Sequence, residues 1–205
     1  AEAKDLAIVV KDLEEKAQLQ IEQVVESYRL KAEGHNVLFA YRKAAAAQRK
    51  IVDIIRANTE EETLELADAN GDLALTLRNL GEYTAALTAQ LADTKTKEKL
   101  LDDDDEELAT SYNDLALIYR DLGDYERALQ AQQKALAIQE QVLEPNHPHI
   151  ATSYNNLATI YRDLGDYERA LQTQQKALAI KKQVLEPNHP SIATSFNNLA
   201  DIYKD

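Results

Sequence analysis

The sequence of 205 residues contains no cysteine, methionine or tryptophan, and only five glycines and four prolines. Without cysteine there can be no disulfide framework, no thiolate metal site and no cysteine nucleophile. Methionine is absent even at position 1, so we expect the chain to be part of a longer protein. The scarcity of glycine and proline, together with abundant alanine, leucine, glutamate, glutamine and lysine, favours helix throughout.

Long apolar runs and an excess of basic charge are also missing. No run approaches the ~20 apolar residues of a membrane span, and there is no signal peptide pattern. The net charge of −13 falls on the residues after position 60, because residues 1–60 carry equal numbers of basic and acidic side chains. A surface this acidic repels phosphate backbones, which argues against nucleic acid as a partner. We expect no membrane contact and a cytoplasmic location.

All four prolines lie in two copies of one loop, and the loop belongs to a repeat. Residues 111–152 and 153–194 are identical at 36 of 42 positions. In residues 148–164 apolar side chains recur at spacings of three and four, which predicts a first helix. Gly165 and Asp166 are expected to end this helix and to cap a second one, with Gly165 at positive φ. The connection is so short that the two helices must form an antiparallel hairpin.

Such a hairpin cannot bury its apolar stripe alone, so stacked copies must share a continuous core. The repeat carries regularly placed residues at Tyr154, Leu157, Ala158, Tyr161, Gly165, Ala170 and Ala177. In these places it resembles the tetratricopeptide repeat (TPR), in the longer kinesin-light-chain form common in bacterial proteins. The resemblance is strong over residues 105–205 and weaker upstream, where the loop reads DDDDE instead of EPNHP. It implies an all-α superhelix, a TPR solenoid of antiparallel helix pairs.

The resemblance also divides the chain into helical units. Residues 1–57 are expected to form a long-helix hairpin at the N-terminus, either as a cap for the array or as a degenerate repeat. The amphipathic pattern of residues 1–33 leaves a third interpretation open, which is self-association through a coiled-coil seam. The remaining units are a degenerate repeat at 58–104, two full repeats at 105–146 and 147–188, and a half repeat or cap at 189–205.

We expect no enzyme activity, no cofactor and no metal site. There is no glycine-rich phosphate loop, and Ser111, Ser153 and Ser195 have no base at a helical offset. His147 and His189 belong to the repeated loop, so they are interpreted as turn residues near helix N-termini rather than as metal ligands. Carboxylates are numerous, but we expect them on solvated helix faces, where nothing raises a pKa.

The resemblance implies that the first helix of each pair lines a concave face, and that this face binds extended peptides, as in kinesin light chains. An asparagine amide can donate to and accept from a peptide group, and an arginine can bind a carboxylate at two points. Alternatively, these side chains only solvate the groove, with Arg120 and Arg162 paired to neighbouring aspartates. The predicted groove residues are Asn113, Asn155, Asn156, Asn197, Asn198, Arg78, Arg120, Arg162, Lys204 and Thr159.

We therefore predict a non-enzymatic interaction module, a scaffold that binds a protein or peptide segment with some acidic character to match the arginines. The alternative is a regulatory or sensor segment of a larger bacterial signalling protein, whose catalytic or ATPase domain lies outside this chain. Removing Asn155 and Asn197 together should weaken binding without unfolding the array. Changing Gln132 and Gln174, on the second helices, should do little.

Overall fold

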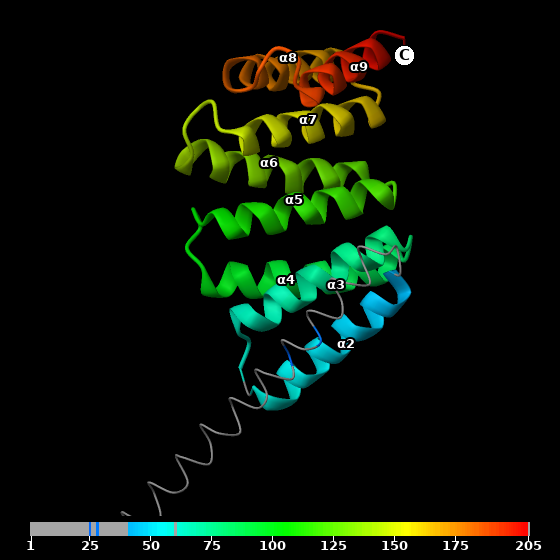
Figure 1. The fold of residues 1–205 in the computed structure, drawn as a ribbon, viewed down its shortest axis with the longest axis vertical. Helices are drawn as coiled ribbons and strands as arrows, with labels where there is room; N and C mark the ends of the chain where they lie inside the picture. Colours follow the sequence, from blue (N-terminus) through cyan, green and yellow to red (C-terminus); the bar gives the residue numbers. More distant parts are fainter. Residues whose placement is uncertain (1–24, 26–27, 29–40, 60, 205) are drawn as a thin grey trace, which may run out of the picture.

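The helices of this chain stack in pairs along one direction. The structure, a computed structural model, describes Val25, Tyr28 and residues 41–59 and 61–204, and these form helices and turns without a strand. The helices follow one another in chain order, from α2 at one end to α9 at the other (Figure 1). The predicted all-α array is confirmed. Its helices are α2 (Tyr41–Asn58), α3 (Leu64–Asn79), α4 (Tyr83–Leu100), α5 (Glu106–Asp121), α6 (Tyr125–Val142), α7 (Pro148–Asp163), α8 (Tyr167–Val184) and α9 (Pro190–Lys204).

The turn inside each pair has the chemistry that the sequence predicts. Gly81, Gly123 and Gly165 adopt φ of 77°, 78° and 78°, a conformation that glycine enters without the penalty of a Cβ atom. Across the last of these turns, the backbone N–H of Asp166 donates to the carbonyl of Tyr161 at 2.8 Å. The carboxylate of Asp166 then accepts from the first turn of α8. One helix is thus ended and the next begun within three residues.

Small residues let the helices approach closely, and successive pairs share their core. Ala128, Ala158 and Ala170 are fully buried, as the close contact between paired helices requires. Ile160 of α7 lies in one apolar cluster with Leu115, Tyr119 and Ala131 of the preceding pair. Because each pair completes the core of its neighbour, the stability of the array is a sum over neighbouring units.

Helix α2 stands where the second helix of a repeat pair would precede α3. It packs against α3 as α4 packs against α5. Its Ala44 and Gln48 precede Ala86 and Gln90 by 42 residues, and all four are buried. The 42-residue register of the repeats thus extends upstream to α2. The seam proposed for residues 1–33 lies outside the described residues, except for Val25 and Tyr28.

One expectation about individual side chains is corrected. Gln132 and Gln174 are fully buried, so they cannot serve as the neutral surface changes that the sequence suggested. In the part of the chain that the structure covers, no helix combines the length and apolar character needed to cross a bilayer.

Candidate functional site

The contacts between pairs identify the inner side of the array. The first helices are α3, α5, α7 and α9, and each of the first three touches the next one directly. The second helices α4, α6 and α8 contact the first helices on either side of them, but at most marginally one another. The array therefore curves with its first helices inside. We call the non-core side of α3, α5, α7 and α9 the concave face.

Asparagine amides join consecutive first helices on this face. The Oδ1 atom of Asn113 accepts a hydrogen bond from Nδ2 of Asn156 at 2.9 Å. One repeat later, Oδ1 of Asn155 accepts from Nδ2 of Asn198 at 2.9 Å. These four residues, which we call the asparagine ladder, are all among the predicted groove residues. The structure brings them together across the repeat boundaries.

Buried glutamines hold the ladder from behind. Gln132 donates from Nε2 to Oδ1 of Asn113 at 3.3 Å, and Gln174 donates to Asn155 at 3.2 Å. Sequence reasoning missed this role because a glutamine on a helix is ordinarily exposed. The available signal was its recurrence at 42-residue intervals, at Gln48, Gln90, Gln132 and Gln174.

The predicted arginines are paired inside the array. Nε of Arg78 lies 2.5 Å from Oδ2 of Asp121, and Arg162 lies 3.3 Å from Asp163. Arg120 lies between the two aspartates, 3.5 Å from Asp121 and 4.0 Å from Asp163. We call these five residues the arginine–aspartate row. This arrangement is the one that the sequence left open as the alternative, in which neighbouring aspartates neutralise the guanidinium groups.

The other predicted groove residues have fewer internal partners. Lys204 is 4.0 Å from Asp201 and its side chain is 78% exposed. Thr159 donates to the carbonyl of Asn155 on its own helix at 3.0 Å. Asn197 is exposed, and its side chain makes no hydrogen bond within the described residues. These groups are available to a bound molecule at the α9 end.

The asparagine ladder stops at α3, where Gly71 stands in the position of Asn113. Asp114, in the position of the donor Asn156, instead accepts a hydrogen bond from Nδ2 of its neighbour Asn113 at 3.4 Å. A Cβ atom on Gly71 would lie 3.5 Å from Asp93, a buried carboxylate on α4. Asp93 accepts from the hydroxyl of Ser111 and lies 3.0 Å from Nζ of Lys97. A charged cluster thus replaces the neutral amides of the later repeats.

Burial raises the pKa of the carboxyl groups of Asp93 and Asp114. Loss of solvent raises the pKa of Asp93, although the hydrogen bond from Ser111 and the charge of Lys97 oppose the rise. Burial likewise raises the pKa of Asp114, although the hydrogen bond from Asn113 opposes the rise, and the nearby charge of Asp93 adds to it. The expectation that nothing raises a carboxyl pKa is wrong at these two positions, because Asp93 is buried and Asp114 is half-buried.

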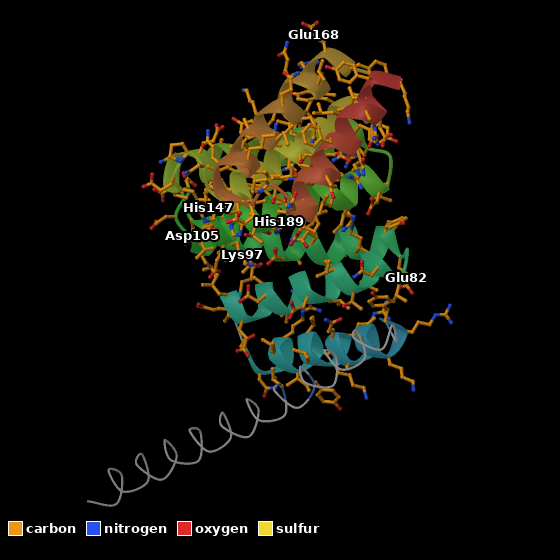
Figure 2. All side chains as sticks on the ribbon, turned by 45° about the horizontal axis from the view of Figure 1, so that its top comes forward. Glu82, Lys97, Asp105, His147, Glu168 and His189 are labelled. Carbon is orange, nitrogen blue, oxygen red and sulfur yellow. The ribbon has the colours of Figure 1, made fainter. Side chains whose placement is uncertain are left out.

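The histidines of the repeated loop are helix caps. Nδ1 of His147 accepts from the backbone N–H of His149 at 3.2 Å, and His189 accepts from that of Ser191 at 3.1 Å. With Asp105, the cap of α5, they stand at the starts of successive first helices (Figure 2). Among the described residues no group of histidine, aspartate and glutamate side chains could hold a metal ion. The turn-residue interpretation of His147 and His189 is confirmed.

The repeats also match a known protein-family model. The family model of the tetratricopeptide repeat matches residues 65–141, 107–183 and 150–205. No curated protein sequence matches the chain.

Solved structures of similar fold share little sequence with the chain. BtubC (BKLC) from P. vanneervenii aligns with TM-score 0.80 and 23% identity, over 95% of this chain and 77% of that one. Kinesin-light-chain-type, nearly identical TPR-like repeats from Podosopora anserina align with TM-score 0.78 and 22% identity, over 88% and 85%. The apo form of RapI aligns with TM-score 0.73 and 20% identity, over 88% and 63%. At these identities the likeness shows the fold alone.

Proposed function

The chain belongs to the tetratricopeptide repeat family, and from this membership we propose that its concave face holds an extended segment of a partner protein. Repeats of this family generally act as non-catalytic modules that bind proteins or peptides. We therefore propose a scaffold that binds a partner protein and catalyses no reaction.

The asparagine ladder is the observation that carries this proposal. Its amides recur at the same place in successive repeats, and internal hydrogen bonds fix their orientation before any partner arrives. Groups held in place beforehand lose little conformational entropy on binding, which favours affinity. At Asn155 the carbonyl is occupied by Gln174 and Asn198, which leaves its amide N–H groups to face a ligand.

The repeat spacing suits a peptide backbone. Neighbouring helices pack about 8–10 Å apart, and an extended chain advances about 3.3 Å per residue. One amide would therefore meet the ligand about every third residue. Backbone contacts of this kind do not depend on the ligand's side chains. The regularly repeated helix pairs therefore match the regularly repeated peptide groups of the ligand.

A second set of concave positions differs between repeats and would select side chains. One helix turn from the ladder, the residue changes from Leu75 to Leu117, Thr159 and Asp201. Leu75 is 50% exposed. We propose that this row distinguishes partners, whereas the ladder holds any extended backbone.

The test begins with capture of partners by the full chain, followed by mapping of the captured segment and calorimetric titration of that peptide. Replacing Asn155 and Asn197 together with alanine should weaken binding by about 1–3 kcal/mol, the scale for hydrogen bonds lost at a desolvated site. The matched control replaces Gln175 and Gln183, two exposed amides on α8, with alanine and should leave the affinity unchanged.

Loss of binding must be separated from loss of structure, because Asn155 also holds Gln174 and Asn198. Circular dichroism at the titration temperature reports whether the double variant is folded. The single change Asn197→Ala breaks no hydrogen bond within the described residues, so its effect on affinity is free of this concern. Parental affinity in both asparagine variants would place the binding site away from the concave face.

A further inference from the structure

One pocket recurs between the second helices of the array, but its size differs from one repeat to the next. The first copy, which we call the outer pocket, lies between α2 and α4 against the core side of α3. The second copy lies between α4 and α6 against α5, and its walls are built from the same eleven positions, each 42 residues further along the chain. The outer pocket has a volume of about 410 Å³ and the second copy about 220 Å³. Ligand pockets usually measure about 300–1,000 Å³, a range that includes only the outer pocket of these two.

Large side chains of the chain itself fill the smaller copy. Tyr112 and Tyr119 on α5 supply two aromatic rings. Nζ of Lys134 lies 4.6 Å from the ring centroid of Tyr112, and the guanidinium of Arg127 lies 5.1 Å from that of Tyr119. The hydroxyl of Tyr112 donates to Glu98. Each ring thus has a cation over its face, which is a favourable arrangement.

In the outer pocket smaller residues stand in these places. Both rings and both cations are lost, and their replacements leave a largely apolar wall. Because the four changes occur together, the extra volume belongs to this repeat as a whole and not to one residue. The counterparts of Tyr112, Tyr119, Arg127 and Lys134 are Asn70, Leu77, Ala85 and Ala92.

Two polar groups of the outer pocket are without partners. Asn70 is only 5% exposed, and its Nδ2 donates to the carbonyl of Leu66 at 2.8 Å, whereas its Oδ1 accepts no hydrogen bond within the described residues. Arg56 stands in the position of Glu98 and pairs with no side chain in the part of the chain that the structure covers. An acceptor and a cation in a mostly apolar pocket fix the orientation of a ligand. The pocket thus offers a cation without a ring and an acceptor without a donor.

We propose that the outer pocket binds a tyrosine side chain of a partner protein. The phenol ring fills the space that aromatic and basic side chains occupy in the next repeat, against Leu77 and Ala92. Its hydroxyl donates to Oδ1 of Asn70, and Arg56 supplies the cation for its ring. The source is a protein because repeats of this family bind protein or peptide partners. The pocket lies on the core side of α3 and not on the concave face, so this inference does not depend on the proposed function.

The probes are three uncharged compounds, N-acetyltyrosinamide, N-acetylphenylalaninamide and N-acetylleucinamide. Titrated into the full chain and followed by backbone amide shifts in NMR, the tyrosine compound should bind with a dissociation constant on the order of 1 mM, as expected for a ligand of this size. It should bind about fivefold more tightly than the phenylalanine compound, the scale for one hydrogen bond. The phenylalanine compound should in turn bind about threefold more tightly than the leucine compound, because only a ring attracts the cation of Arg56.

A variant that refills the pocket locates the site. Ala92→Lys installs the side chain that the next two repeats carry as Lys134 and Lys176, so the array should accept it. This variant should bind N-acetyltyrosinamide about tenfold more weakly, because the lysine occupies the space of the ring. The matched control, Ala57→Lys, adds the same charge at an exposed position of α2 outside the pocket and should change the affinity less than twofold.

A second variant tests the hydrogen bond to the hydroxyl. Asn70→Ala removes the acceptor and leaves the apolar wall in place. The preference for the tyrosine compound over the phenylalanine compound should then disappear, while the phenylalanine compound binds at least as tightly as before. If both compounds lose affinity alike, Asn70 acts only through the structure of α3 and the assignment of the hydroxyl fails.

Each other outcome overturns the inference. Equal affinity for the three compounds would show that the surface is merely apolar, and equal losses in the two lysine variants would place the binding site elsewhere. A blocked pentapeptide with tyrosine between two pairs of alanines tests the source of the side chain. It should bind at least as tightly as N-acetyltyrosinamide. If the pocket admits the single amino acid but excludes the pentapeptide, its ligand is a small molecule and not a partner protein.

Discussion

Asn113 on α5 accepts a hydrogen bond from Asn156 on α7 at 2.9 Å, across the boundary between two repeats. The same bond joins Asn155 to Asn198 one repeat further on. The bond joins one position of a repeat to the following position of the next repeat. The donor position differs between the two repeats, since Asp114 corresponds to Asn156, and the acceptor position before it is Gly71. Donor and acceptor are therefore both absent at the α3–α5 boundary.

Removing the acceptor of this bond should destabilise the array. Asn155→Ala leaves the donor of the buried Gln174 without its partner and frees Asn198, so we expect a loss of about 1–3 kcal/mol in the free energy of unfolding. Asn197→Ala removes the same group from an exposed position without an internal bond and should cost less than about 0.5 kcal/mol. Urea unfolding monitored by circular dichroism measures both. Equal stability of the two variants would contradict the role assigned to Gln174.

Substitution should destabilise the protein at the turn glycines, but not at the helical Gly71. Gly165 has φ of 78°, and valine there should cost about 1–2 kcal/mol, because a β-branched residue disfavours the left-handed region. Gly71 is helical, and a Cβ atom at this position would make only an ordinary contact with Asp93 at 3.5 Å. Gly71→Ala should therefore be neutral or stabilising by up to about 1 kcal/mol. Thermal melts of the two variants should move in different directions.

Overpacking distinguishes buried from exposed alanines on a single helix. Ala170 on α8 is fully buried, and leucine there should cost about 1–3 kcal/mol by forcing α7 and α8 apart. Ala179, on the same helix, is exposed and should accept leucine within about 0.5 kcal/mol. If melting of the Ala170→Leu variant matches that of the parent, the close contact is wrongly assigned.

Helix positions could be predicted from sequence because their causes are local. Gly165 ends one helix through its backbone conformation, and Asp166 caps the start of the next. Apolar spacing defines the buried side of each helix. The partners of Asn113, Arg78 and Gln132 lie 19–43 residues away in the chain. Their pairing depends on how one repeat sits on the next, which no single segment encodes. The sequence therefore predicted which side chains lie on the first helices, but not which of their groups are already engaged.

The raised pKa of Asp114 makes stability depend on pH. Burial favours its protonated form in the folded state, so its contribution is fully present below its unfolded pKa of about 3.9 and is lost as pH rises through the higher folded value. Asp114→Asn removes this loss, so the variant should be more stable than the parent at pH 7, and the advantage should shrink towards pH 4. Asn156→Asp should have the opposite effect at pH 7, because it replaces the donor to Asn113 by a carboxylate. Urea unfolding of both variants at the two pH values measures this.

Tyr154 and Glu140 form a pair that changes between repeats. The hydroxyl of Tyr154 donates to Glu140, whereas the equivalent residues downstream are Phe196 and Lys182, with Nζ of the lysine 5.0 Å from the ring centroid. A phenylalanine has no hydroxyl for a glutamate to accept, and a lysine instead finds the face of the ring. The two positions should therefore be energetically coupled. Tyr154→Phe alone should cost about 0.5–1.5 kcal/mol, and adding Glu140→Lys should recover part of the loss, which a double-mutant cycle measures.

The same tyrosine supplies a check on that hydrogen bond at alkaline pH. Burial, followed by the bond to Glu140 and the charge of that group, raises the pKa of Tyr154 to about 12. Because the folded state holds the proton more tightly, this contribution to stability is complete below the unfolded pKa of about 10 and declines as pH rises towards the folded value. The parent should thus lose more stability than the Tyr154→Phe variant between about pH 9 and pH 11.5. Parallel curves for the two proteins would contradict the raised pKa of Tyr154, to which both its burial and its bond to Glu140 contribute.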